Sequence, residues 1–199
     1  RPAPLAPPER RVPVPERAVP DGILRPLTEQ AAAEVAERVA ALDPEAVAVC
    51  LLHAYRHPQH ERLLGEALRR RLGEEVHISL SHEVTATFRE YERAATTEVD
   101  AALSPLLRRY LRRLVDGARA AGLPEPSIMQ SSGGLTDAAT AAGHASLTVL
   151  SGPAGGAAAA MLLADRLGEP NLLCFDMGGT SCDVCVVEDG QVRISPSHP

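Results

Sequence analysis

Apolar positions in the first half of the chain alternate between helix-like and strand-like spacing. Thr28 is expected to cap a helix that ends near Leu42, and the near-continuous apolar run over residues 46–54 is typical of a buried parallel strand. An amphipathic helix is predicted over residues 59–72, and a further strand over residues 75–80. This β-α-β order predicts an α/β fold of the doubly wound type.

A much longer helical pattern covers residues 84–121. Its apolar residues recur every three or four positions, which predicts that one apolar face is buried. These residues are Phe88, Tyr91, Ala95, Val99, Leu103, Leu106, Tyr110, Leu114 and Ala118. Pro105 cannot donate the helical hydrogen bond at its position, so a kink or break is expected near Ser104.

The chain begins with a proline-rich segment over residues 1–26. Dense proline disfavours a helix and favours an extended path. We expect a linker that follows a further domain, with residues 11–14 forming one edge strand.

A helix of small residues is predicted from Ser151, the expected N-cap, with Pro153 in its first turn. Because this helix lacks a polar face, we expect it to be buried. Gly152, Gly155 and Gly156 would allow another backbone to approach it closely.

Residues 172–187 are typical of two apolar strands joined by a glycine turn. Gly178 and Gly179 are expected to take positive φ and to present their N–H groups to an anion. Thr180 and Ser181 add hydroxyl donors to this phosphate cradle. The carboxylates of Asp176 and Asp183 would repel phosphate directly, so their expected partner is a hydrated Mg²⁺. A plain hairpin with no ligand is the alternative.

Two further motifs leave alternatives open. Residues Ser131, Ser132, Gly133 and Gly134 follow a predicted strand end, where α/β sheets bind ligands, although such a sequence also suits an ordinary turn. Arg89 and Arg93 are either a substrate or interdomain surface or part of an exposed helix with paired charges.

Cysteine and histidine spacing raises the question of a metal site. Cys182 and Cys185 have C-x-x-C spacing, but residues three apart on a strand point to opposite faces, so we interpret them as ordinary thiols. His53, His57 and His60 are interpreted as part of a strand-to-helix junction at Pro58 in preference to metal ligands.

Composition narrows the class of protein. The net charge of −6 argues against nucleic-acid binding. No apolar run reaches the ~20 residues that a membrane span needs, and the first residues lack the apolar core of a signal peptide, so a cytoplasmic protein is expected. Abundant alanine, with arginine in place of lysine throughout, suggests a bacterial source.

Three motifs together resemble the hydantoinase A/5-oxoprolinase family: residues 128–134, 150–156 and 175–181. Further matches lie upstream, at residues 50–55, 57–61 and 89–93 and at Thr96 and Thr97. Two positions depart from the family pattern, because Cys182 replaces the usual Thr and Ser132 the usual Asn.

The resemblance implies part of an actin-like ATPase, or ribonuclease H-like, fold. Residues 1–26 would be a linker or edge strand, residues 27–145 the α/β part with the long helix, and residues 146–199 the connecting helix and phosphate-binding hairpin. The implied activity is ATP-dependent hydrolysis of a cyclic amide, with Mg²⁺ and with a hydantoinase B-type subunit or fused domain as partner. This chain would supply one phosphate loop and be inactive by itself.

The resemblance also implies roles for individual residues. Asp176 and Asp183 would hold Mg²⁺, the four residues 178–181 would contact phosphate, and Gly152, Gly155 and Gly156 would cross beneath the cleft. An acetone carboxylase-type subunit that activates a ketone or bicarbonate is the alternative with the same fold. A non-enzymatic, nucleotide-switched actin-like or chaperone-like protein is the alternative in another class.

Overall fold

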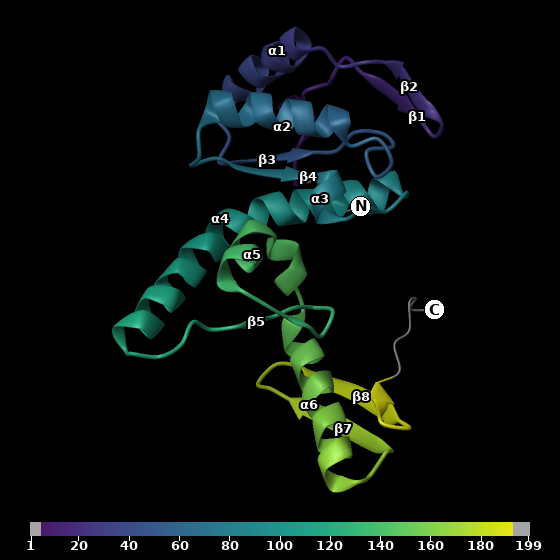
Figure 1. The fold of residues 1–199 in the computed structure, drawn as a ribbon, viewed down its shortest axis with the longest axis vertical. Helices are drawn as coiled ribbons and strands as arrows, with labels where there is room; N and C mark the ends of the chain where they lie inside the picture. Colours follow the sequence, from purple (N-terminus) through teal and green to yellow (C-terminus); the bar gives the residue numbers. More distant parts are fainter. Residues whose placement is uncertain (1–4, 193–199) are drawn as a thin grey trace. The chain divides into compact units, whose positions relative to one another are not determined.

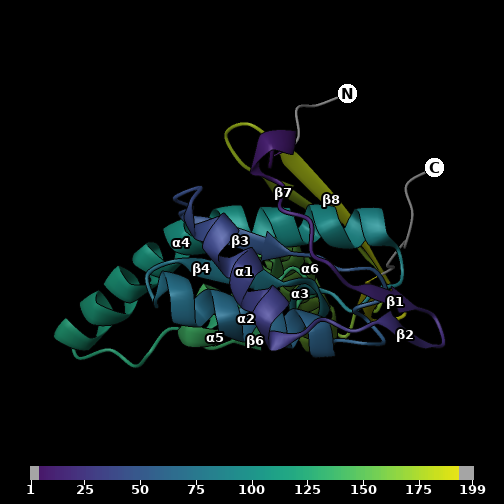
Figure 2. The same cartoon turned by 90° about the horizontal axis from the view of Figure 1, so that it is seen from above.

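The computed structural model describes residues 5–192, which form two compact units (Figures 1 and 2). Unit 1 comprises the residues up to Gly117 together with Ala142–Ser146. Unit 2 comprises Ala118–Ala141 and the residues from Leu147 onward. The three expected sequence domains stay a prediction.

Unit 1 begins with a hairpin in the proline-rich segment. The short 3₁₀ helix η1 (Pro8–Arg10) precedes the antiparallel strands β1 (Arg17–Val19) and β2 (Gly22–Arg25). The edge strand expected over residues 11–14 is wrong, since these residues take no regular structure. Pro13 and Pro15 have no N–H for a strand ladder, so pairing begins only beyond them.

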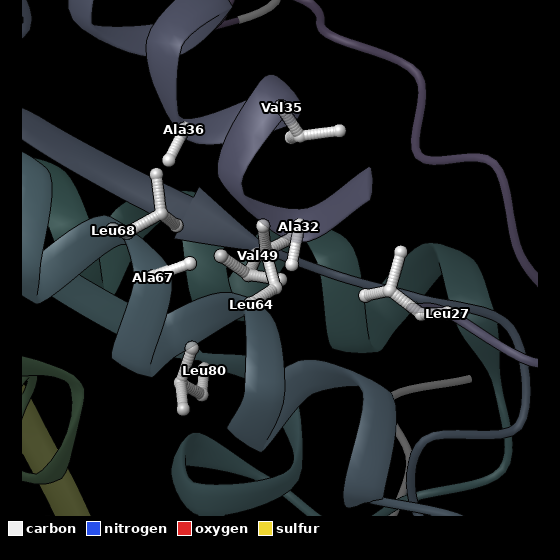
Figure 3. Packing of buried hydrophobic residues seen from close by; sticks show 9 residues of the cluster. All are labelled: Leu27, Ala32, Val35, Ala36, Val49, Leu64, Ala67, Leu68 and Leu80. Atoms are coloured by element: carbon white, nitrogen blue, oxygen red, sulfur yellow. The ribbon is translucent and has the colours of Figure 1, made fainter. Parts of the chain in front are cut away.

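The centre of unit 1 is the expected β-α-β arrangement. Strands β3 (Ala46–Val49) and β4 (His77–Leu80) pair in parallel and are connected through helix α2 (Gln59–Leu72), against which α1 (Glu29–Ala40) packs. Thr28 caps α1 as predicted, because its Oγ1 accepts a hydrogen bond of 3.2 Å from the Ala31 N–H. Figure 3 shows the core that these elements enclose, built from Leu27, Ala32, Val35, Ala36, Val49, Leu64, Ala67, Leu68 and Leu80.

Strand β3 is shorter than the apolar run over residues 46–54 predicted. Side chains take both backbone hydrogen-bonding groups of Leu51, because its N–H donates to Glu61 and its carbonyl accepts from Arg93, each at 2.8 Å. With these groups occupied, Leu51 has no ladder to offer a neighbouring strand. The chain turns instead, and His53 takes a left-handed φ of 55°.

The expected long helix is α4 (Glu90–Ala120), which follows the single turn α3 (Ser81–Val84). It therefore begins six residues later than the predicted start at residue 84. Pro105 does not break α4, but Figures 1 and 2 both show the helix bending along its length, as the missing hydrogen bond predicts.

The buried face of α4 is the opposite of the one expected. Its buried residues are Arg93, Thr97, Asp100, Ala101, Ser104 and Leu111. The predicted apolar face is largely exposed. Helical spacing correctly indicated an amphipathic helix, but the polar side is the one that has hydrogen-bond partners in this chain.

Unit 2 contains the hairpin β5 (Ile128–Met129) and β6 (Leu135–Thr136), helix α6 (Ser151–Leu167), and the antiparallel sheet β7 (Leu172–Met177), β8 (Cys182–Glu188) and β9 (Gln191–Val192). Two short helices, α5 (Ala138–Gly143) and η2 (Ala145–Thr148), span the boundary between the units.

Helix α6 lies against β7 and β8 (Figure 1), with Ala160, Ala164 and Val187 at the centre of the contact. The expectation that α6 is buried all round is wrong, because Leu162 and Leu163 are exposed. The described part of unit 2 covers only one side of the helix. Ser151 is also the first helical residue and not the N-cap, a position that Leu150 takes with φ 60°.

Candidate functional site

The expected metal ligands face each other in the β7–β8 hairpin. Asp176 and Asp183 are direct register partners of the antiparallel pair, and both are exposed. They line a hollow together with Pro153, Gly156, Ala157, Cys174, Val184 and Cys185. Like charges directly opposite each other on a sheet are destabilising, and a cation bound between them would relieve the repulsion.

The glycine turn between these strands differs from its prediction in one respect. Gly178 and Gly179 are absent from the glycines with positive φ in the described chain. The Gly178 N–H donates a hydrogen bond of 3.0 Å to the Ser181 carbonyl, so it closes the hairpin. A Cβ on Gly179 would meet nothing within 4 Å, and one on Gly178 would make only ordinary contact with Ser181. Neither dihedral angles nor neighbouring atoms in this chain therefore require glycine here.

The three glycines of α6 occupy different environments. A Cβ on Gly156 would lie 3.2 Å from Asp176 Oδ2, which is closer than ordinary van der Waals contact. A Cβ on Gly155 would lie 3.8 Å from the Met129 side chain, and one on Gly152 would meet nothing within 4 Å. Of the three, Gly156 is the glycine that gives the carboxylate its room.

Two cysteines extend this site beyond the sequence prediction. Cys174 and Cys185 are register partners two residues along the same strands, and both line the hollow beside the carboxylates. The pKa of the Cys185 thiol is raised, mainly because the group is partly buried and secondly because the Cys174 thiol lies beside it. The sequence could have predicted this position of the two cysteines, because alternate residues of a strand share one face, as residues 174 and 176 do, and likewise residues 183 and 185.

Residues 131–134 form a tight turn. The N–H and Oγ of Ser131 donate to the Leu147 carbonyl at 2.7 and 3.0 Å, and Ser132 Oγ donates to Gln130 Oε1 at 3.4 Å. Gly133 has φ 86°, a left-handed conformation that favours glycine. These contacts account for the loop as a turn, and its ligand role stays a prediction.

Arg89 and Arg93 differ in solvent exposure. Arg89 is exposed and pairs with Glu92 at 3.4 Å. Arg93 is 0% exposed, and its guanidinium donates to Ser81 Oγ and to the carbonyls of Leu51 and Thr87. The exposed charged helix, one of the two alternatives for these arginines, is therefore wrong for Arg93, because its donors are directed to protein acceptors.

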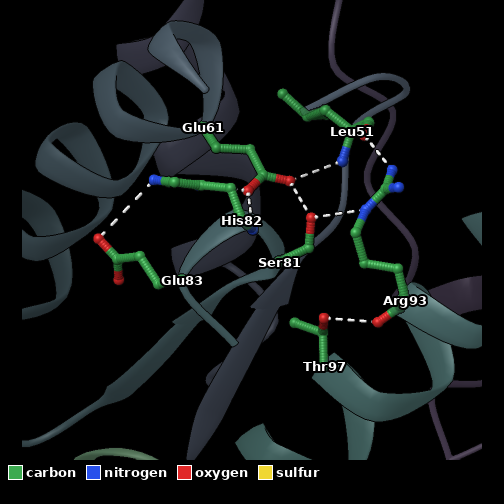
Figure 4. Close-up of polar contacts among 7 residues, drawn as sticks. All are labelled: Leu51, Glu61, Ser81, His82, Glu83, Arg93 and Thr97. Carbon is green, nitrogen blue, oxygen red and sulfur yellow. Dashed lines mark hydrogen bonds and ion pairs between the residues drawn. The ribbon is translucent and has the colours of Figure 1, made fainter. Parts of the chain in front are cut away.

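Glu61 is the second buried charge of this network and had no role predicted from the sequence (Figure 4). Its carboxylate is 0% exposed and accepts four hydrogen bonds, from the Leu51 N–H, Ser81 Oγ, and the backbone N–H and Nδ1 of His82, at 2.7–3.0 Å. Ser81 Oγ lies between Glu61 and Arg93, so it links the two charges. The network joins the ends of β3 and β4 to α4.

The histidines near Pro58 make structural contacts. His60 bonds Glu16 Oε2 through Nδ1 at 2.7 Å and accepts the Leu27 N–H at Nε2, while His57 Nε2 lies 3.2 Å from the Pro20 carbonyl. Within residues 5–192, no three His, Cys, Asp or Glu side chains converge as a metal cluster. The same residues include no helix long and apolar enough to cross a membrane.

The chain matches known protein families. The hydantoinase/oxoprolinase family model matches residues 93–198, just over half of the chain, and the model of the family's N-terminal region matches residues 2–72. The chain is 33% identical to caprolactamase subunit alpha of Pseudomonas jessenii over 96% of its length, and 37% identical to 5-oxoprolinase of Saccharomyces cerevisiae over 75%. It spans 28% of the former protein and 11% of the latter.

Two solved structures share the fold. The crystal structure of ATP-dependent caprolactamase from Pseudomonas jessenii gives a TM-score of 0.79 at 32% identity, covering 90% of this chain and 26% of its own. Nucleotide-free acetone carboxylase gives 0.73 at 29% identity, covering 88% and 25%. These neighbours confirm the expected fold class, an incomplete actin-like ATPase fold of mixed α/β structure. The chain belongs to the hydantoinase/oxoprolinase family.

Proposed function

We propose that the β7–β8 hairpin and the first turns of α6 form one side of a Mg·ATP phosphate site in an enzyme that opens cyclic amides. The observation that carries this proposal is the in-register pair of Asp176 and Asp183, which lines a hollow together with Gly156. A bare hairpin gains nothing from opposed carboxylates, whereas a bound cation turns their repulsion into binding energy.

The donors present fit magnesium. Mg²⁺ prefers hard oxygen ligands and is commonly held by one or two carboxylates together with waters and phosphate oxygens. Asp176 and Asp183 supply the two carboxylates and are exposed enough to leave positions for water and substrate. A cage built entirely from protein ligands is not needed for this type of site.

The turn beyond the carboxylates fits a phosphate group. Thr180 and Ser181 are exposed and carry hydroxyl donors, while Gly178 and Gly179 present backbone with no Cβ in the way. Since neither glycine is required by its φ or by neighbours in this chain, close approach of the backbone to a ligand remains a physical reason for both. Gly178 contributes shape, because its N–H is already bonded to Ser181.

The proposed chemistry divides between ATP and the chain. ATP, when bound, would supply a phosphoryl group that converts the amide oxygen into a better leaving group. The residues of this chain would orient the phosphates and balance their charge. Similarity to an ATP-dependent caprolactamase and to 5-oxoprolinase supports an amide substrate over the ketone implied by the acetone carboxylase structure, to which identity and TM-score are lower.

The remaining parts of the enzyme are proposed on the same basis. Because the chain spans 28% of the caprolactamase subunit, the adenosine pocket and the other phosphate loop would come from the rest of the protein. The relative is named as a subunit, which supports a hydantoinase B-type partner or fused domain.

The test is ATP hydrolysis by the complete enzyme across a Mg²⁺ titration. Asp176→Asn and Asp183→Asn should each lower turnover by about 100-fold or more, because each removes an electrostatic contact to the reacting phosphates. Asp189→Asn is the matched control, since Asp189 lies in the β8–β9 turn and does not line the hollow. Full turnover with unchanged Mg²⁺ dependence in both hairpin variants would refute the site.

A further inference from the structure

The two cysteines that line the hollow of unit 2 are paired across strands β7 and β8. Cys174 and Cys185 are direct register partners, and both are free thiols joined by a side-chain hydrogen bond. Residues directly opposite on antiparallel strands have Cα atoms about 4.5–5.5 Å apart, and disulfides join Cα atoms about 4.4–6.8 Å apart. The backbone therefore already holds this pair within disulfide range.

The C-x-x-C motif of the sequence is a poorer disulfide pair. Cys182 is exposed and pairs in register with Met177. Because alternate residues of a strand share a face, Cys182 lies on the face of β8 opposite to that of Cys185. A bond between these two cysteines would require β8 to leave its extended form. A bond between Cys174 and Cys185 leaves both strands paired.

The two thiols lie between the core of unit 2 and the carboxylate pair. On one side they pack against the buried cluster of Ala160, Ala164 and Val187. On the other side, Asp176 and Asp183 form the next register pair on the same face, two residues along each strand. A covalent change at the thiols is therefore passed to the carboxylates through a short stretch of sheet.

Closing a disulfide would move the two strands. Cβ atoms of opposed residues lie about 4.5–5.5 Å apart in a sheet, while a disulfide holds them about 3.8 Å apart. The strands would therefore approach by about 1 Å at this pair, and the two like-charged carboxylates would be forced together. A displacement of about 1 Å at a reacting group can cost 100-fold in rate. Strain also makes the bond easier to reduce, as is typical of regulatory disulfides.

We propose that Cys174 and Cys185 form a reversible disulfide whose closure switches off the neighbouring nucleotide site. The oxidant is a small-molecule disulfide such as oxidised glutathione. One cysteine thiolate attacks a sulfur of the oxidant, its S–S bond breaks, and one glutathione thiolate leaves. The other cysteine thiolate attacks the resulting mixed disulfide, and the second glutathione thiolate leaves. The protein pair thus gives up two electrons and two protons, which reduce the oxidant to two thiols. The switch rests on the proposed function, whereas the disulfide itself does not.

Disulfide mapping of the complete enzyme, equilibrated in glutathione redox buffers, tests the pairing. After free thiols are blocked, cleavage on the amino side of aspartate places the three cysteines of the hairpin in separate peptides, residues 165–175, 176–182 and 183–188. The first and third peptides should be recovered as one cross-linked species that dithiothreitol separates. Cys185→Ala should abolish the cross-link. Cys182→Ala, the matched control on the opposite face, should retain it.

Steady-state ATP hydrolysis by the same samples tests the switch. Turnover of the wild type should fall by at least about 10-fold as the cross-link accumulates and should return on reduction. Turnover of Cys185→Ala should not depend on the glutathione potential. Thiols that stay reduced throughout, glutathione adducts without a cross-link, a bond to Cys182, or equal turnover of the oxidised and reduced wild type would each overturn the proposal.

Failure of this proposal can be told apart from failure of the proposed function. The mapping needs no nucleotide, so it reports the pairing whatever the hairpin binds. The Asp176 and Asp183 variants described above report separately whether the hairpin is a Mg·ATP site.

Discussion

Replacing Gly156 with alanine should separate the stability of unit 2 from the function of its carboxylates. The added Cβ would lie 3.2 Å from Asp176 Oδ2, so the carboxylate must shift by a few tenths of an ångström. Alanine favours an α-helix over glycine by about 1 kcal/mol, and turning an exposed carboxylate away from its rotamer costs about the same. The free energy of unfolding should therefore change by less than about 1 kcal/mol.

Function should respond differently. A displacement of about 1 Å in a reacting group can cost 100-fold in rate, so a shift of a few tenths should lower Mg²⁺-dependent ATP hydrolysis by about 10-fold. Gly117→Ala is the matched control, because Gly117 is a glycine of helix α4 whose added Cβ would also meet nothing within 4 Å, and it lies outside the proposed site. It should keep full activity.

The assay pairs thermal unfolding of both variants with steady-state ATP hydrolysis by the complete enzyme across a Mg²⁺ titration. Gly156→Val extends the series, because its extra methyl groups should add an overpacking penalty of about 1–3 kcal/mol to the loss of activity. The reasoning fails if Gly156→Ala retains normal activity and Mg²⁺ dependence, or if Gly117→Ala loses as much activity.

Two predictions concern the buried charges of unit 1. Burial alone would raise the pKa of Asp100, but the neighbouring His77 ring, 3.9 Å away, and hydrogen bonds from Ser146 and Ser79 outweigh it and lower the pKa to about 2. The ordinary pKa is 3.8, so the stabilisation from ionised Asp100 is present above pH 3.8 and is lost as the pH falls towards 2. Over this range, urea titrations should show the free energy of unfolding falling by about 2 kcal/mol more in the wild type than in Asp100→Asn. Equal pH dependence in the two proteins would contradict this prediction. Glu61→Gln should lower the free energy of unfolding by about 3 kcal/mol at neutral pH, because the new amide N–H groups would face groups that already donate hydrogen bonds. Glu66→Gln, at an exposed position on the same helix, should change the stability little. Equal stabilities of the two variants would count against the network.

The elements that sequence predicted well are those whose signals are local. Helix α2 ends before Gly73 as expected, with φ 78° at that glycine, and Thr28 caps α1 through its own neighbour in sequence. The facing of Asp176 and Asp183 also follows locally, because a short turn fixes the register of the strands it joins.

The failures arose where distant residues decide the outcome. The polar face of α4 is buried because Asp100 accepts hydrogen bonds from Ser79 and Ser146, which lie 21 and 46 residues away in the sequence. Hydrophobic spacing cannot detect such partners. Strand β3 ends early for the same reason, since Glu61 and Arg93 reach Leu51 from later segments. In both cases specific hydrogen bonds override the apolar pattern.

The network around Glu61 and Arg93 has a consequence for sequence divergence. Several of its contacts are to backbone atoms, namely the N–H and carbonyl of Leu51, the carbonyl of Thr87 and the N–H of His82. Every residue except proline supplies both of these backbone groups, so most substitutions at residues 51 or 87 leave those hydrogen bonds in place. The side chains on which the network depends are therefore those of Glu61, Arg93 and Ser81, and residues in the surrounding loops can be substituted without loss of these hydrogen bonds.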